Sequence, residues 1–281
     1  MAKLAQRFSI SYYRTKLKIL SLVSSKKAAA FAISLFSTPQ FTYRKPLTRL
    51  FEESEKLEFS QNGKTITGYR WNQGGKHKIL ITHGFNSSVV KFERYIALLL
   101  EKGYEVLAFD APAHGYSSGK TLNVVEFKNM IKTIHEKYGP VNSFIGHSFG
   151  GLAISLAMEE IEHGEDSKVV LIAPATESSF AMEYFFELMR VKKAVQKEFN
   201  EQVIKLSQKP IEWYSVSRAV ENIKARILWC HDEGDRVTPF TDAKKVMYKN
   251  YPNVEFLVTK GLGHHRIYRD NNVVKAIIDF L

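Results

Sequence analysis

The sequence predicts an α/β fold, with a mostly parallel central sheet flanked by helices. Short apolar runs alternate along the chain with segments of helical periodicity, the pattern of parallel strands joined by crossover helices. The chain has 281 residues, of which 44% are hydrophobic, enough for one α/β domain. In addition, an apolar run at 141–145 leads through the peptide Gly-His-Ser-Phe-Gly at 146–150 into a helical pattern that ends near 162.

The predicted strands and helices follow one another in a regular order. Runs at 57–59 and 65–71 are joined through Asn62-Gly63, a pair that favours the tight turn of an antiparallel hairpin. Longer apolar runs predict buried strands, and amphipathic segments predict helices between them. The strands are expected at 78–82, 104–110, 141–145, 168–173, 225–231 and 254–259, and the helices at 90–102, 124–138 and 149–162.

The segment 146–150 fits the turn that presents a nucleophilic serine, Ser148. Gly-x-Ser-x-Gly alone is a weak signal, because it occurs by chance in roughly one in ten chains of this length. Here it lies between a strand and a helix, where small flanking residues let the two elements pass closely. The alternative is a serine that only begins the helix, as many helix-capping serines do.

Three segments in chain order extend this interpretation. Ser148 is followed by Asp235, in His-Asp-Glu-Gly-Asp, and then by His264, in Gly-Leu-Gly-His. This order of nucleophile, acid and histidine resembles that of the α/β-hydrolase superfamily. The resemblance covers about 57–281 and implies the α/β-hydrolase fold with a small helical cap. It includes the turn at 83–85, the segment Asp-Ala-Pro-Ala-His-Gly-Tyr-Ser at 110–117, and the loops after the last two strands.

Nine histidines compete for the role of general base. The resemblance favours His264, which follows the last strand in the position of the family's histidine loop, and His265 is its nearest rival. The serine hydroxyl needs such an imidazole, because it is a poor nucleophile until a base takes its proton. The resemblance assigns structural roles in loops to three others, His83, His114 and His147.

Asp235 is expected to orient the imidazole and to stabilise its charged form. It is followed by Val237 and Pro239, which is similar to the family's acid loop. Asp232 competes for the role, because it stands where the family commonly has glycine. Its side chain is expected to cap the turn instead.

The oxyanion formed during acyl transfer needs hydrogen-bond donors that are already in place. The resemblance implies that the backbone N–H groups of Phe85 and Phe149 supply them. Their side chains would then shape the pocket.

The stretch of about 175–214 is longer than a simple crossover and is expected to form the cap. The alternative is a helix pair with a purely structural role. Apolar side chains on its predicted helices are expected to line a pocket for an apolar acyl group. These pocket candidates are Phe180, Tyr184, Phe185, Met189 and Phe199.

Together these features predict a carboxylesterase-like or lipase-like enzyme that cleaves an ester of a small or medium apolar substrate. A thioesterase or an acyltransferase would use the same three residues, and a non-catalytic ligand-binding or scaffold protein can have the same fold. The predicted acyl-enzyme mechanism requires neither a metal ion nor an organic cofactor.

Residues 1–50 form a separate basic segment, with ten basic residues and no acidic one, whereas 51–281 is close to neutral. The net charge of +11 therefore does not indicate a nucleic-acid partner for the catalytic part. Apolar residues at roughly helical spacing in this segment predict either peripheral contact with anionic membranes or accessory helices packed on the hydrolase body. They are Leu4, Phe8, Tyr13, Leu17, Leu20, Phe31 and Leu35.

The single cysteine, Cys230, lies in an apolar strand and is expected to be an inert core thiol. One cysteine cannot form an internal disulfide, which favours a cytoplasmic location. The longest apolar stretch without charge, 28–36, is too short to span a membrane, since a spanning helix needs about 20 residues. Lys26 and Lys27 interrupt the apolar region that a signal peptide would need.

Overall fold

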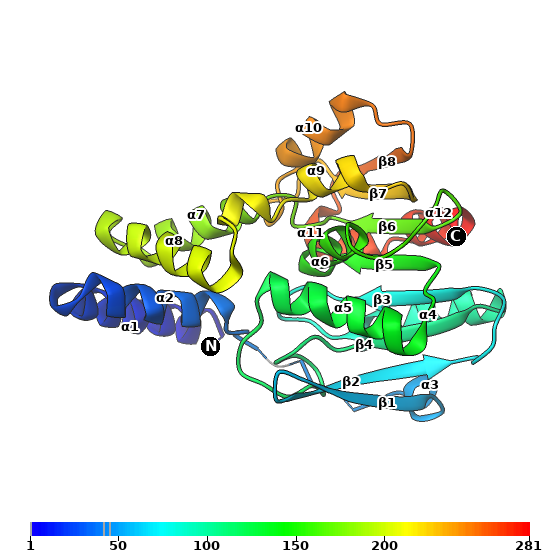
Figure 1. The fold of residues 1–281 in the computed structure, drawn as a ribbon, viewed down its shortest axis with the longest axis horizontal. Coiled ribbons are helices and arrows are strands. Elements are labelled where there is room, and N and C mark those ends of the chain that lie inside the picture. The colour runs from blue at the N-terminus through cyan, green and yellow to red at the C-terminus, as the bar shows by residue number, and fades with distance from the viewer. Residues whose placement is uncertain (1, 42, 45) are drawn as a thin grey trace. The chain divides into compact units, whose positions relative to one another are not determined.

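A computed structural model describes residues 2–41, 43–44 and 46–281, with side chains from residue 9 onward. The chain forms two compact units, each made of two segments. The helical unit comprises Met1–Thr38 and Glu177–Tyr214, and the sheet unit comprises Pro39–Thr176 and Ser215–Leu281. Figure 1 shows the elements of both.

The sheet unit is built on an eight-stranded sheet with the order β1-β2-β4-β3-β5-β6-β7-β8. The first two strands form an antiparallel hairpin, β2 pairs antiparallel with β4, and the remaining strands are parallel. This confirms the predicted sheet. The strands are β1 (Glu55–Gln61), β2 (Lys64–Trp71), β3 (Lys78–Thr82), β4 (Glu105–Phe109), β5 (Ser143–His147), β6 (Lys168–Ile172), β7 (Arg226–Asp232) and β8 (Val254–Thr259).

Local sequence explains the form of these strands. Asn62 and Gly63 both have positive φ, 50° and 72°, as a two-residue hairpin turn of this hand requires. Every residue of β4 and β5 is buried, because helices cover both faces of the parallel part of the sheet. The edge strand β8 is only partly buried.

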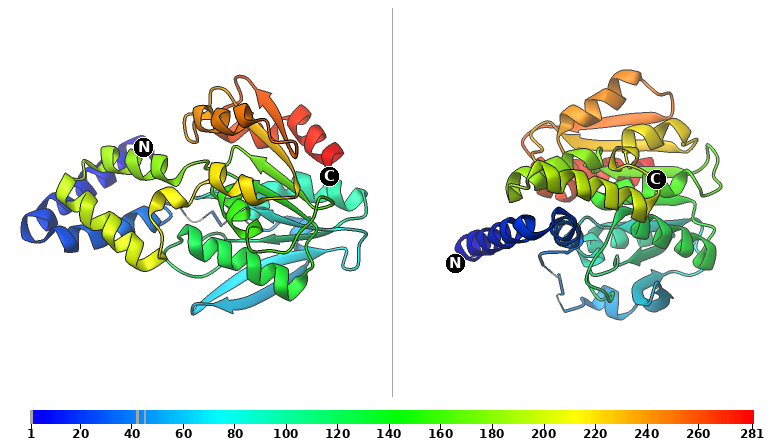
Figure 2. Two further views of the ribbon diagram at one scale, coloured as in Figure 1. Left: turned by 45° about the horizontal axis from the view of Figure 1, so that its top comes forward. Right: turned by 60° about the vertical axis from the view of Figure 1, so that its left-hand side comes forward.

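Helices cover the sheet on two sides, as Figures 1 and 2 show. On one side α4 and α12 pack on the strands through a core that includes Ile96, Leu99 and Ile277, while α5 and α6 pack against each other on the other side. The main helices of this unit are α4 (Glu93–Glu101), α5 (Val124–Tyr138), α6 (Phe149–Met158), α10 (Phe240–Lys249) and α12 (Asn271–Phe280). Shorter ones are α3 (Arg49–Glu52), α9 (Val216–Ala219) and α11 (Gly263–Arg266), with 3₁₀ turns at Val89–Phe92, Val220–Asn222 and Ile267–Arg269.

The helix after Ser148 ends earlier than its sequence predicts. It stops at Met158 rather than near 162. Ile161 belongs to the predicted helical pattern, but it follows the end of the helix, and its side chain is still buried. Burial alone therefore does not distinguish a helical residue from a turn residue that folds back on the core.

The helical unit brings the N-terminal helices together with the predicted cap helices. It contains α1 (Ala2–Val23), α2 (Ser25–Ser37), α7 (Ser178–Met189), α8 (Lys193–Ser207) and a 3₁₀ turn at Ile211–Trp213. Three alanines on α2 face a shared core, and their small size allows α8 to approach closely. This core includes Leu17, Ala28, Ala29, Ala32, Met182, Phe186, Met189, Val195 and Phe199.

The basic N-terminal segment contributes its apolar side chains to this core. Leu17 is buried in it, and the other described residues of the predicted apolar stripe pack against it. The side chains of Leu4 and Phe8 lie outside the described residues. The stripe therefore packs on α7 and α8, a partner that the sequence analysis did not consider. Among the described residues, no helix is long and apolar enough to cross a membrane.

Candidate active site

Ser148 occupies a sharp turn between β5 and α6. Its backbone has φ 55° and ψ −120°, a conformation that a non-glycine residue adopts only at a cost in energy. The amide of Ser148 donates to the carbonyl of Ile172 on the neighbouring strand, which ties the turn to the sheet. This is the strand-turn-helix geometry of a nucleophile elbow.

Neighbouring glycines allow this turn to form. A Cβ atom at Gly146 would lie 2.7 Å from the Cα of Gly151, and one at Gly150 would lie 2.6 Å from the carbonyl oxygen of His83. Both distances are too short for real contacts, so a side chain at either position would force backbone apart. The Gly-x-Ser-x-Gly spacing thus has a steric cause in this fold.

The three residues that the sequence analysis singled out lie next to one another. His264 Nε2 is 3.1 Å from Ser148 Oγ, and His264 Nδ1 is 2.8 Å from Asp235 Oδ2. Asp235 comes from the loop after β7 and His264 from α11, after β8. All three side chains are buried. The arrangement can transfer a proton from the serine hydroxyl to an imidazole whose other nitrogen is held by a carboxylate.

The surroundings of Asp235 keep its carboxyl group charged. Burial alone would raise the pKa of its carboxyl, but the hydrogen bond and charge of His264, with the amides of Thr238 and Val237, lower it to about 2. Those amides donate to Oδ1 at 3.0 and 2.8 Å, and Oδ2 accepts from His264 and from the hydroxyl of Thr238. Oδ1 therefore holds the loop, and Oδ2 orients the imidazole.

Asp232, the competing carboxylate, makes different contacts. Its oxygens accept from the amides of Gly234 and Leu262 at 2.9 Å and from the hydroxyl of Thr259 at 2.8 Å. These bonds join the end of β7 to the loop that carries His264. Asp232 contacts that loop through its backbone, whereas Asp235 contacts the imidazole itself.

The histidines next to His264 differ in their surroundings. His265 is exposed, and its ring packs edge-on to that of His264 at 5.1 Å. His147 is buried and donates from Nε2 to the backbone carbonyl of His264 at 3.1 Å. Burial lowers the pKa of His147 well below its usual value, so the ring is neutral. His147 therefore fixes the position of the loop that carries His264.

Two further histidines hold the loops after β3 and β4. His83 donates to the carbonyl of Gly84 and accepts from the amide of Ala111, and His114 accepts from the amide of Asn86. Burial lowers the pKa of His83 to about 4 and that of His114 to about 3. Both rings are therefore neutral at physiological pH and can accept from these amides.

The loop after β3 passes directly beside Ser148. A Cβ atom at Gly84 would lie 2.9 Å from the Cβ of Ser148. Phe149 is the first residue of α6, where amides have no partner within the helix, and no backbone carbonyl of the described residues accepts from the amide of Phe85. The rings of Phe85 and Phe149 pack edge to face, with centroids 5.7 Å apart. Both amides thus belong to segments that meet at the serine.

Thr238 is a member of this site that the sequence analysis missed. Its hydroxyl donates to Asp235 Oδ2 at 2.9 Å and lies 3.1 Å from His264 Nδ1. The same oxygen is 3.2 Å from the carbonyl of Ala173 at the end of β6. A threonine three residues after the acid was the available signal, but its meaning depends on the loop conformation.

Replacing Thr238 by valine is expected to lower kcat by roughly tenfold with little change in KM, because one hydrogen bond that orients the acid and imidazole is lost. Steady-state kinetics on an activated ester would measure this. Thr238→Ser keeps the hydroxyl and should retain most of the activity. Equal losses in both variants would show that the methyl group, and not the hydroxyl, matters.

The predicted pocket residues all lie in the helical unit. Phe199 and Met189 are part of its core, Phe185 is partly buried against that core, and Tyr184 is exposed. Phe180 is half-buried near the start of α7. Two of the five side chains, Met189 and Phe199, are therefore part of the core of the helical unit. That any of the five lines a substrate pocket stays a prediction.

The other reactive groups of the chain are its single cysteine and the side chains that could bind a metal ion. Cys230 is buried within β7, and burial raises the pKa of its thiol. In the part of the chain that the structure describes, no group of three or more histidine, cysteine or acidic side chains is arranged to hold a metal ion.

Comparison with known proteins gives consistent matches. Residues 74–227 match the model of the family described as serine aminopeptidase, S33. The chain is 29% identical over 120 residues to the uncharacterized hydrolase YugF of Bacillus subtilis, covering 41% of this chain and 42% of that protein. It is 27% identical over 124 residues to putative esterase/lipase 3 of Mycoplasma pneumoniae, covering 44% of each. The aligned segments thus span less than half of these curated relatives.

A solved structure covers more of the chain. The esterase Pf2001 of Pyrococcus furiosus aligns with a TM-score of 0.63 and 22% identity, over 87% of this chain and 97% of that one. At this identity the likeness concerns the fold, which is that of the α/β-hydrolase superfamily.

Proposed function

Because the chain belongs to the serine aminopeptidase S33 family, and so to the hydrolases of the α/β-hydrolase superfamily, we propose that it is a serine hydrolase that cleaves carboxylic esters of small or medium apolar substrates. The observation that carries the proposal is the buried series of contacts from Ser148 Oγ through His264 to Asp235, at 3.1 and 2.8 Å. Each contact is within hydrogen-bond distance, as proton transfer from a serine requires.

The proposed reaction follows the acyl-enzyme route. Ser148 Oγ attacks the ester carbonyl carbon while His264 Nε2 takes the hydroxyl proton, and the amides of Phe85 and Phe149 stabilise the oxyanion. His264 then gives this proton to the departing alcohol. Water, deprotonated by the same imidazole, attacks the acyl carbonyl. The bond from this carbon to Ser148 Oγ then breaks, the imidazolium returns its proton to Oγ, and the acid is released. Asp235 keeps the imidazole in the tautomer that these steps need.

Labelling with a fluorophosphonate tests the proposal directly, because this probe modifies activated serines. Mass spectrometry should find the label on Ser148, and Ser60→Ala, which removes an exposed serine on β1, should label as fast as the wild type. Absence of labelling would favour a non-catalytic scaffold. Turnover of aminoacyl anilides or thioesters with little ester hydrolysis would instead identify an aminopeptidase or a thioesterase, and acyl transfer to an added alcohol would identify an acyltransferase.

The apolar character of the substrate rests on the cap residues and has its own test. If side chains such as Tyr184 and Phe185 line the acyl site, each added methylene should improve kcat/KM, by up to about 0.8 kcal/mol in transition-state binding, until the site is full. A series of p-nitrophenyl esters from acetate upward measures this. A maximum at acetate followed by a steady decline would mean that these residues serve only the packing of the helical unit.

A further inference from the structure

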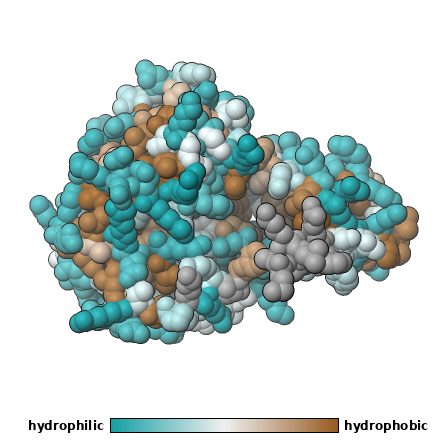
Figure 3. Space-filling view, turned by 180° about the vertical axis from the view of Figure 1, so that it is seen from behind, coloured by the Kyte–Doolittle hydropathy of each residue, from teal (hydrophilic) through white to brown (hydrophobic). Residues whose placement is uncertain are grey.

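The helical unit exposes an unusual share of large hydrophobic side chains. Seven of the twelve that are exposed among the described residues belong to this unit of 76 residues. Four of them are on α1, namely Tyr12, Ile19, Leu22 and Val23, with exposed fractions of 61%, 57%, 72% and 75%. Figure 3 shows hydrophobic residues reaching the surface of this unit among hydrophilic ones.

Three of these four residues of α1 form one face, and Leu22 lies about 60° beyond Ile19 at its border. With about 100° between successive residues of a helix, Tyr12, Ile19 and Val23 point within about 40° of one another. This face is separate from the one that carries Leu17 into the core. The core is filled by the other stripe of α1, and most of the surface of this second apolar face stays outside it.

The same unit is strongly basic. Its two segments contain thirteen basic and six acidic residues, and all six acidic residues lie in 177–214. Lys16 and Lys18 are exposed on α1 beside the apolar face. Their long side chains can bury their stems at an interface while the ammonium groups stay in the polar layer.

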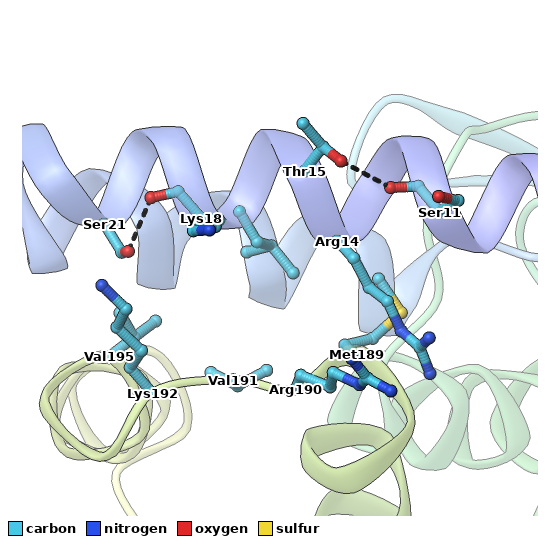
Figure 4. A pocket seen from close by; sticks show the side chains of 11 residues that line it. Ser11, Arg14, Thr15, Lys18, Ser21, Met189, Arg190, Val191, Lys192 and Val195 are labelled. Carbon is cyan, nitrogen blue, oxygen red and sulfur yellow. Dashed lines mark hydrogen bonds between the residues drawn. The ribbon is translucent and has the colours of Figure 1, made fainter.

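A basic groove lies beside this face, between α1 and the connection of α7 to α8. It has a volume of about 350 Å³, and its charged lining residues are Arg14, Lys18, Arg190 and Lys192, all cations. Figure 4 shows Lys192 extending from that connection toward α1. Arg14 is held by the carbonyl of Leu188 at 2.8 Å, and within the described residues none of the four cations forms an ion pair with a carboxylate.

We propose that the helical unit docks the protein on anionic phospholipid bilayers, with the exposed face of α1 in the interface and a lipid phosphate in the basic groove. An amphipathic helix with cations beside its apolar face is suited to the interface of an anionic membrane. A second copy of the chain is a poorer occupant, because two surfaces of the same positive charge repel each other. A nucleic acid would use the cations but would leave Ile19, Leu22 and Val23 in water.

Sedimentation of the full chain with vesicles tests this proposal. The protein should bind vesicles of phosphatidylcholine mixed with phosphatidylglycerol far better than vesicles of phosphatidylcholine alone. Binding should fall steeply between about 0.1 M and about 1 M salt, because the screening length falls from about 10 Å to about 3 Å. No difference between the two vesicle types would overturn the proposal.

Two double variants separate the charge from the apolar face. Lys18→Gln with Lys192→Gln should weaken binding to the mixed vesicles by about fivefold for each cation, so roughly 25-fold together. Leu22→Ser with Val23→Ser should weaken it by roughly tenfold or more through loss of buried apolar area. All four side chains are exposed, so the variants should fold, which circular dichroism would check.

Matched controls come from the sheet unit. Lys76→Gln with Lys260→Gln removes two exposed lysines, and Tyr248→Ser with Val258→Ser removes two exposed apolar side chains. Neither should change vesicle binding by more than about twofold. If the control variants lose as much vesicle binding as the test variants, the binding depends only on net charge or general hydrophobicity, and the proposal is overturned. The proposal would also be overturned if the protein forms a dimer in solution and the variant Leu22→Ser with Val23→Ser dissociates it. Tighter binding to DNA than to vesicles would overturn it as well.

Discussion

Replacement of Ser148 by alanine is expected to lower the turnover of an activated ester by roughly a thousandfold or more, because the residues of a serine triad act as a unit. Among the described residues, the side chain of Ser148 makes one hydrogen bond, to His264, so the fold should not depend on it. Alanine keeps the Cβ atom, and the strained backbone at this position changes little. Hydrolysis of p-nitrophenyl esters together with a thermal unfolding curve would measure both properties.

Two further variants make this result interpretable. Ser60→Ala removes an exposed serine from β1 and should leave both activity and unfolding temperature unchanged. His264→Ala should cost about as much activity as Ser148→Ala, and the double variant should cost little more than either alone. Near-wild-type activity of Ser148→Ala would exclude the serine mechanism.

The two carboxylates after β7 should behave very differently when each is changed to asparagine. Asp235→Asn is expected to cost on the order of 10⁴ in kcat, because the amide favours the wrong tautomer of His264. Asp232→Asn should cost much less activity but roughly 1–3 kcal/mol of stability, since at least one partly buried donor loses its acceptor. The contacts of Asp232 with Leu262 and Thr259 hold the loop rather than the imidazole.

Kinetics and thermal unfolding of the two variants form one test. The effect of Asp235→Asn should appear mainly in kcat, and that of Asp232→Asn mainly in the unfolding temperature. The opposite ranking in kcat would make Asp232 the orienting acid and would require a different loop conformation from the one described.

Local sequence patterns predicted the strands and turns of the sheet unit well where one physical cause dominates. The bounds of β3 and β8 agree with the expected 78–82 and 254–259, because each is an apolar run between polar turns. The Asn62-Gly63 hairpin was predictable because only a few residue types accept positive φ at both turn positions. The end of α6 was not predictable in this way, since Ile161 satisfies the hydrophobic pattern without being helical.

Parts of the candidate site depended on contacts between distant segments. Thr238 and His147 make their hydrogen bonds to His264 across 26 and 117 residues of chain, so no short motif contains both partners. From the sequence, Asp235 was expected to orient the imidazole and Asp232 to cap its turn. The bonds that Asp232 accepts from Thr259 and Leu262 come from residues 27 and 30 positions away, so no short motif contains them.

The sequence by itself determined the order of strands and helices, the turn around Ser148 and the chemical groups available to it. These depend on side-chain size, polarity and backbone preference over a few neighbouring residues. The tertiary structure decided what the apolar stripe of α1 and α2 packs against. Leu17 and Phe199 share one core although 182 residues separate them in the sequence. Hydrophobic periodicity shows that a helix has a face to bury, but the partner that buries it is selected by complementary shape.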